Sequence, residues 1–353
     1  MSGLALARSV VVLASSLAAV SCGGGSSGAT HEYDLRFLVS DGFVAAEHTD
    51  ASLVNPWGIA PNPVGVWWVA DAGTSKSTLY TGEGTPQSLV VDVAGAPTGT
   101  VYYGGNAFLV TDGTSTAPAR FLFATEAGTI LGWSADVPPP TSTTAQVVAD
   151  ESLGGAIYKG LAVAGDRLYA TDFHNARVDV FDGAFGLLTL PGAFAPPGVP
   201  AGYAPFGIQA VGNQVIVTYA LQDALAEDEV AGPGLGYVEA FDLDGNFVEE
   251  VEAGGVLNAP WGIALAPQTF GVHGGCLLVG NFGDGRISSY QRDGGGWYLA
   301  GQLRTSAGAP VEIEGLWGIA FGVGGATGPA DALFFAAGSG DEAHGLFGRI
   351  DPR

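Results

Sequence analysis

The sequence predicts an all-β fold, a six-bladed β-propeller with four-stranded antiparallel blades. One observation is a repeated step, since "PWGIA" occurs at residues 56–60 and 260–264 and "LWGIA" at 316–320. A second is composition: 57 of 353 residues are glycine, 47% are hydrophobic and only 13% are charged. Such a chain is too apolar to be disordered and too rich in glycine for a helical protein.

Three weaker copies of the step lie between the strong ones, which gives six repeats with spacings of 41, 61, 47, 55 and 56 residues. A repeat of this length is typical of propeller blades. After each glycine we expect an apolar strand, a second strand that often ends in a polar residue, and a third with an aromatic residue near its end; several repeats add a fourth strand. The anchoring glycines are Gly58, Gly99, Gly160, Gly207, Gly262 and Gly318.

Closure of the ring is predicted from the two ends of the chain. The last repeat stops after a third strand, "GLFGRIDP" at 345–352, whereas "YDLRFLVSD" at 33–41 precedes the first repeat. We expect residues 33–41 to be the outer strand of the last blade, because this pairing removes an open sheet edge. The propeller is therefore predicted to span residues 33–353.

The N-terminus indicates export. Residues 1–21 are predicted to be a lipoprotein-type signal peptide, because the apolar run at 9–20 is too short to span a bilayer. "AVSC" resembles a bacterial lipobox, which predicts lipidation of Cys22, and residues 22–32 are rich in glycine and serine, as in a flexible tether. The expected location is the bacterial cell envelope, periplasmic or surface; an ordinary signal peptide and a secreted protein are the alternative. Cys276, in an apolar run, is expected to be buried.

The segment "LYATDFHNARVDVFD" at 168–182 resembles an NHL repeat. The series that includes "NPWGIA", "YKGLAV", "AGYAPFGIQ" and "LLVGNFGDG" is similar to a family of uncharacterised exported bacterial proteins that often carry PEP-CTERM sorting tails. This resemblance covers residues 33–350 and implies an NHL-like propeller with no established activity. The lipobox and the lack of a sorting tail imply a different route of anchoring here.

Net charge excludes some partners. At −23 the chain repels nucleic acid and anionic lipid heads, so we expect neither partner and membrane contact only through the lipid anchor. Cations, neutral sugars and uncharged organic molecules are compatible with this charge. The sequence favours a monomer that binds a small molecule, a glycan or a protein.

The residue before each anchoring glycine is expected to lie at one mouth of the central channel. These six residues are Trp57, Thr98, Lys159, Phe206, Trp261 and Trp317. Two interpretations remain open. The rings pack between blades and seal the channel, or they form an aromatic collar around a ligand pocket with Lys159 as its single cation.

The ends of the second strands and the loops after them are expected to form a rim on the same face. Each rim residue alone is a turn former or a solvated charge, but together they make the face acidic, which suits sugars and cations. The rim residues are Asp71, Glu126, Asp172, His174, Asn281, Asp284, Asp341, Glu342 and His344, with Asp223, Glu227, Asp228 and Glu229 from an insertion at 221–234.

Three functions follow from these patterns: a propeller that binds a ligand or partner through this face, a metal-dependent lactonase or esterase, and a structural cell-surface platform. The hydrolase alternative rests on resemblance to gluconolactonase-like propellers, which hold a divalent metal partly at the inner-strand step. That step lacks oxygen ligands here, and the sequence offers no "HExxH" motif and no "GxSxG" nucleophile elbow. No cofactor is predicted outright, and a metal such as calcium would have to use the second-strand ends Asp71, Glu126, Asp172 and Asn281.

Overall fold

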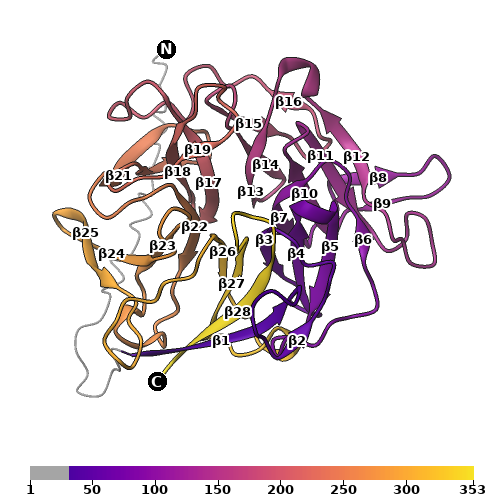
Figure 1. The fold of residues 1–353 in the computed structure, drawn as a ribbon. Coiled ribbons are helices and arrows are strands. Elements are labelled where there is room, and N and C mark those ends of the chain that lie inside the picture. The colour runs from indigo at the N-terminus through magenta and orange to yellow at the C-terminus, as the bar shows by residue number, and fades with distance from the viewer. Residues whose placement is uncertain (1–31) are drawn as a thin grey trace, which may run out of the picture.

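The computed structural model describes residues 32–353, which form six sheets around a central axis (Figure 1). Each of these six sheets is one blade, and its strands are antiparallel from the axis outward except for one short parallel pair at an outer edge. The six-bladed propeller that the repeats predict is therefore confirmed. No helix within the described residues is long and apolar enough to cross a membrane.

Five blades have four strands on the path from the axis outward, and in two of these blades insertions separate the strands along the chain. Blades 1 to 3 consist of β3 (Pro56–Pro61), β4 (Trp67–Asp71), β5 (Lys76–Tyr80) and β6 (Val91–Asp92); β7 (Pro97–Tyr102), β10 (Phe121–Thr125), β11 (Thr129–Trp133) and β12 (Gln146–Asp150); and β13 (Tyr158–Ala164), β14 (Arg167–Asp172), β15 (Arg177–Phe181) and β16 (Leu187–Leu188). Blades 4 and 5 consist of β17 (Tyr203–Val211), β18 (Gln214–Gln222), β20 (Tyr237–Asp242) and β21 (Phe247–Ala253); and β22 (Pro260–Leu265), β23 (Leu277–Asn281), β24 (Ile287–Asp293) and β25 (Gly296–Gln302).

Blade 6 joins the two ends of the chain. Its strands are β26 (Leu316–Phe321), β27 (Leu333–Ala337), β28 (Leu346–Pro352), β1 (Tyr33–Ser40) and β2 (His48–Thr49). β1 pairs antiparallel with β28 from Tyr33 opposite Pro352 to Ser40 opposite Leu346, which confirms the predicted closure. β1 is the fourth strand and not the outermost one, because the short β2 adds a parallel pair to its outer edge.

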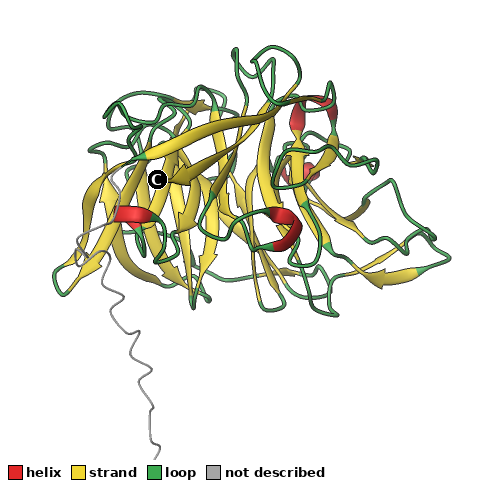
Figure 2. Ribbon diagram, turned by 90° about the horizontal axis from the view of Figure 1, so that it is seen from below, coloured by secondary structure: helices red, strands yellow, loops and turns green. Residues whose placement is uncertain are grey.

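Insertions interrupt the repeats and explain their unequal spacing. The hairpin of β8 (Leu109–Thr111) and β9 (Thr116–Pro118) leaves blade 2, and β19 (Glu229–Val230) pairs back on β18 in blade 4. The side view in Figure 2 shows loops at both faces of the disc and only short helical turns. These turns are the 3₁₀ helices η1 (Ala72–Thr74), η2 (Ser152–Gly154), η3 (Gly271–His273) and η4 (Gly325–Thr327).

The core lies mainly between neighbouring blades. Ile59 and Trp67 of blade 1 pack with Phe334 and Phe347 of blade 6, and comparable clusters fill the other interfaces. Cys276 is buried in the cluster between blades 5 and 6, as expected for a structural cysteine. Burying these apolar faces is the main force that holds radial sheets together.

The anchoring glycines let the six innermost strands crowd the axis. A Cβ at Gly207 would lie 1.9 Å from the carbonyl oxygen of Trp261, and one at Gly318 would lie 2.5 Å from that of Trp57. A Cβ at any of the other four glycines would lie 2.4–2.7 Å from a backbone atom of the following blade, so these close approaches occur at all six blade junctions. The repeated step is therefore a requirement for backbone approach, which only glycine meets.

Two faces of the disc are distinguished below. The proximal face is the one at which the innermost strands begin and the second strands end, and the distal face is the opposite one. All the predicted collar and rim residues belong to strand ends or loops of the proximal face.

Candidate functional site

The aromatic residues before the anchoring glycines form one cluster on the axis, called the aromatic plug. Trp57 stacks on Trp317 with ring centroids 3.5 Å apart, and Trp261 meets both rings edge-on at 5.8 Å. Phe206 meets Trp317 edge-on at 5.8 Å, and Phe282 stacks on Trp317 from outside at 4.0 Å. The four aromatic residues among the six of the predicted collar are all buried, so the rings contact one another across the axis and do not surround an open pocket.

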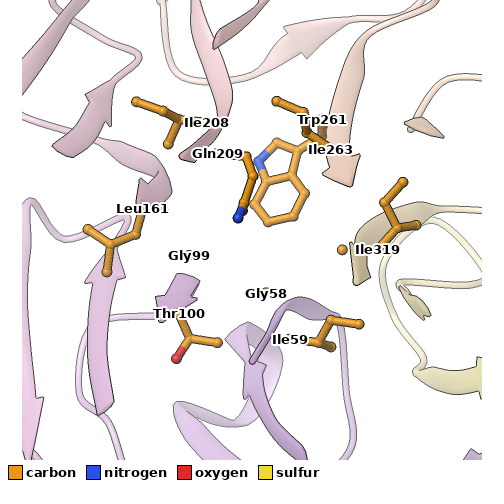
Figure 3. A pocket seen from close by; sticks show the side chains of 11 residues that line it. Gly58, Ile59, Gly99, Thr100, Leu161, Ile208, Gln209, Trp261, Ile263 and Ile319 are labelled. Carbon is orange, nitrogen blue, oxygen red and sulfur yellow. The ribbon is translucent and has the colours of Figure 1, made fainter. Parts of the chain in front are cut away.

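A small axial cavity lies on the distal side of the plug. Its volume is about 40 Å³, enough for a few water molecules. Figure 3 shows a ring of aliphatic side chains around it, with Trp261 and Gln209 reaching toward its centre. The indole N–H of Trp261 donates to the backbone oxygen of Lys159 at 3.1 Å, which fixes this ring across the axis. The aliphatic lining residues are Ile59, Leu161, Ile208, Ile263 and Ile319.

Lys159 stands beside the plug and is the centre of a charge cluster. Its side chain is 1% exposed, and its Nζ lies 5.2 Å from the centre of the Trp57 ring. Nζ donates to Oε1 of Glu126 from blade 2 and, at 3.1 Å, to Oδ1 of Asp228 from blade 4. A lysine buried to this extent must be paired, and here two carboxylates from different blades and an aromatic face compensate it.

Two further carboxyl groups complete the charge cluster. Glu342, on the loop between β27 and β28, accepts a hydrogen bond from the amide nitrogen of Asn55 at 2.6 Å. The amide oxygen of Asn55 accepts one from the indole N–H of Trp317 at 3.2 Å, so Asn55 connects the plug to the cluster. Glu229, next to Asp228, is half-buried and interacts with Lys159 and Glu342.

The pKa values of the cluster reflect an excess of acid. Burial raises the pKa of Glu229 to about 8, with Glu342 and Asp228 adding to the rise and Lys159 opposing it. Burial also raises the pKa of Glu342, against the hydrogen bond from Asn55. Burial acts to lower the pKa of Lys159, but attraction to Glu126, Glu229 and Asp228 outweighs it and the pKa is raised. Four carboxyl groups thus share one ammonium group.

The predicted rim divides into two groups. Glu126, Asp228, Glu229 and Glu342 gather around Lys159, whereas the other residues bond within their own surroundings. His344 pairs with Asp41 at 2.7 Å, His174 meets the backbone oxygen of Ala226 at 3.2 Å, and Asp341 is exposed. Thr98 of the predicted collar donates to the backbone oxygen of Tyr158 at 2.8 Å, which ties blade 2 to blade 3.

The predicted metal candidates do not converge. Asp71 accepts the backbone N–H of Thr78, Asp172 pairs with Arg177 at 3.2 Å, and Asn281 donates to Asp284 at 3.1 Å. Each therefore shapes the turn after its own second strand. Within residues 32–353 no group of three or more His, Cys, Asp and Glu residues could hold a metal ion.

Sequence reasoning did not single out three contributors to this site. Asn55 lies directly before the "PWG" step and adopts a left-handed backbone with φ of 44°, which Asn tolerates better than most residues. Phe173 and Phe282 follow the polar ends of second strands, and both join the plug. Their common position, one residue after Asp172 and Asn281, is the signal that could have found them.

Fold and site together define a six-bladed propeller whose axis is closed by aromatic rings beneath a charge cluster. The chain is 36% identical over 304 residues to uncharacterized protein R648 of Acanthamoeba polyphaga mimivirus, covering 82% of this chain and 73% of that protein. It is 32% identical over 303 residues to uncharacterized protein L690 of the same virus, covering 82% and 78%. The chain belongs to the family that contains these proteins. No family model matches it.

Solved structures share the fold at low sequence identity. A Bacteroides thetaiotaomicron protein of unknown function has a TM-score of 0.56 at 11% identity, covering 91% of this chain and 76% of that one. A streptogramin B lyase has a TM-score of 0.51 at 12% identity, covering 93% and 100%. These likenesses show the fold alone. Because both sequence relatives are viral, the exported bacterial family named above is not what these comparisons found, and a bacterial origin stays a prediction.

Proposed function

We propose that this protein is an exported, lipid-anchored propeller that binds a ligand at the charge cluster on the proximal face. The observation that carries the proposal is convergence. Lys159 comes from blade 3, Glu126 from blade 2, Asp228 and Glu229 from blade 4 and Glu342 from blade 6. Charges that only stabilise a turn come from one blade, whereas these five residues come from four blades. A cluster of polar groups from several blades near the central channel is the arrangement expected of a binding site.

The chemistry of the cluster indicates the kind of ligand. A carboxyl group donates a hydrogen bond when protonated and accepts when ionised, and Glu229, whose pKa is raised to about 8, does either near neutral pH. Glu126 and Asp228 are partly exposed to solvent. Hydroxyl-rich molecules and cationic groups match such a surface, and strongly anionic molecules do not. A glycan, a small polar molecule or a protein segment that carries such groups is the proposed ligand.

Titration calorimetry with a panel of glycans and divalent cations tests the proposal. We expect at least one member to bind, and the binding to weaken about tenfold or more in Glu342→Gln, which loses one charge beside Asn55. Glu227→Gln is the matched control, because Glu227 is exposed and outside the cluster. Binding that is equal in the parent and in Glu342→Gln would place the ligand elsewhere and contradict the proposal.

A metal-dependent lactonase and a structural platform remain the alternatives. The resemblance to gluconolactonase-like propellers suggested the first, but Asp71, Asp172 and Asn281 are engaged within their own blades. No observation on residues 32–353 favours the hydrolase over binding. The same calorimetric panel addresses it, because a divalent cation that binds through these second-strand ends would give a heat that Asp172→Asn removes.

A further inference from the structure

An insertion of blade 4 reaches over the charge cluster. Residues 223–230, called the strap, follow the end of β18 and return as β19, where Val230 pairs with Leu221 and Glu229 with Gln222. The tip is ordered by Asp223, whose Oδ1 accepts the backbone N–H groups of Glu227 at 2.9 Å and Asp228 at 3.3 Å. The strap is therefore a preformed unit, since its own hydrogen bonds do not depend on the cluster.

Few contacts hold the tip of the strap against the rest of the protein. The carboxylate of Asp228 bonds to Lys159 at 3.1 Å although the Asp228 side chain is 74% exposed. The backbone oxygen of Ala226 meets His174 at 3.2 Å. At the base, Gln222 donates to the backbone oxygen of Phe173 at 2.6 Å. The tip can separate from blade 3 without leaving Lys159 unpaired, because Glu126 of blade 2 keeps its own ion pair with Nζ.

We propose that the strap is a closure over Lys159 that opens as the carboxyl group of Glu229 ionises. Glu229 belongs to the strap, directly follows Asp228, whose carboxylate docks the strap on Lys159, and pairs with Gln222 at the base. A new negative charge there repels Asp228 and Glu342, and burial deprives it of hydration while the strap stays closed. This regulation rests on the binding function proposed for the cluster, but the opening is a property of the ligand-free protein.

The charge of every titratable group around the strap affects the free energy of opening. Lys159 and His174 face it from blade 3, Glu126 from blade 2 and Glu342 from blade 6, and Asp223, Glu227 and Asp228 belong to the strap itself. Among the acids of the strap, only Glu229 has a raised pKa, about 8, against an ordinary value of 4.5 that it would recover in water. The closed state thus binds a proton that the open state releases, and opening increases by at most about tenfold per pH unit across this interval.

The accessibility of Lys159 measures the opening directly. The chain contains only two lysines, Lys76 and Lys159, and Lys76 lies partly exposed on β5 as an internal reference. The full chain is acetylated briefly with an amine-reactive ester at pH 6.5 to 8.5, and both lysines are quantified by mass spectrometry. The ratio of the two rates cancels the general rise of amine acylation with pH, because lysine amines ordinarily react through a small unprotonated fraction in this range.

We expect the Lys159-to-Lys76 ratio to rise several-fold between pH 6.5 and 8.5 in the parent chain. In Glu229→Gln the ratio should be flat, while Glu227→Gln, with the same charge change on the same strap, should retain the rise. Asp228→Asn should give a high ratio at every pH. A constant ratio in the parent, or a rise that persists in Glu229→Gln, would refute the proposal that the strap opens as Glu229 ionises. Because no ligand is present, this result is independent of the calorimetric test of binding.

Discussion

Replacing Gly207 by alanine tests the idea that the anchoring glycines set the diameter of the ring. The new Cβ would lie 1.9 Å from the backbone oxygen of Trp261, whereas real Cβ contacts are essentially never shorter than 3.0 Å. The innermost strands of blades 4 and 5 would have to separate by about 1 Å. Because the position of the new Cβ is fixed by the backbone and its partner is a backbone oxygen, no side chain can rotate away to relieve the contact.

The cost of Gly207→Ala follows from this geometry. Overpacking a dense core costs about 1–3 kcal/mol, and a clash of backbone with no relief belongs at or above the upper end. Unfolding entropy is about 2.1 cal/mol/K per residue, so for a propeller of about 320 residues each kcal/mol lowers Tm by about 1.5 °C, and we expect Tm to fall by about 4 °C or more. Differential scanning calorimetry measures the change, and near-ultraviolet circular dichroism reports the tryptophans of the plug.

Gly294→Ala is the matched control for this substitution. Gly294 lies in the turn between β24 and β25, has an ordinary backbone conformation, and a Cβ there would meet nothing within 4 Å. Its Tm should stay within about 2 °C of the parent, as for ordinary surface substitutions. If Gly207→Ala melted like Gly294→Ala, the close approach would not be what the repeated glycine serves, and the reasoning would be refuted.

Three other changes test separate parts of the structure. Burial raises the pKa of Glu239, which is 1% exposed, to about 8, and Glu250 adds to the rise. The contribution of Glu239 to the free energy of unfolding is therefore greatest below pH 4.5 and decreases as the pH rises to 8. Glu239→Gln should melt at a higher temperature than the parent at pH 8.5, and calorimetry across this pH range should show that its Tm lacks this decrease. Deleting residues 31–41 removes β1 from blade 6 and should lower Tm sharply in calorimetry; an unchanged Tm would contradict closure. Cys22, outside the described residues, is predicted to be lipidated, so Cys22→Ser should leave the membrane fraction without unfolding, and unchanged fractionation would contradict the anchor.

The blades and their closure could be predicted because they depend on local pattern. Each "WGI" step combines a glycine that admits a neighbouring backbone with alternating apolar residues, and this information is complete within one repeat. The pairing of residues 33–41 with the last strand followed from counting strands. β2 was missed because a two-residue strand on an outer edge carries no periodic signal.

The site could be predicted only in part because it depends on distances across the axis. Lys159 and Asp228 are 69 residues apart, and their ion pair requires the strap to extend from blade 4 over blade 3. The sequence predicted that both residues lie on one face of the propeller, but it did not indicate how far the strap extends toward blade 3. In the same way, the spacing of the tryptophans does not determine whether their rings surround a space or stack, since that depends on rotamers and on the width that the glycines allow.

The differences among the six repeats locate the site more sharply than their likeness does. Tryptophan precedes the glycine only in blades 5, 6 and 1, which are neighbours, and their rings fill that side of the axis. Blades 2 and 3 carry Thr98 and Lys159 at the same step, and the charge cluster has formed on their side. The glycine is constrained by the fold in every blade, whereas the residue before it is free to vary. A buried lysine that four carboxyl groups share contributes little to folding by itself, since burying charge is costly even when it is paired. The binding function that we propose gives a reason for its presence at this step, and the fold alone does not require it.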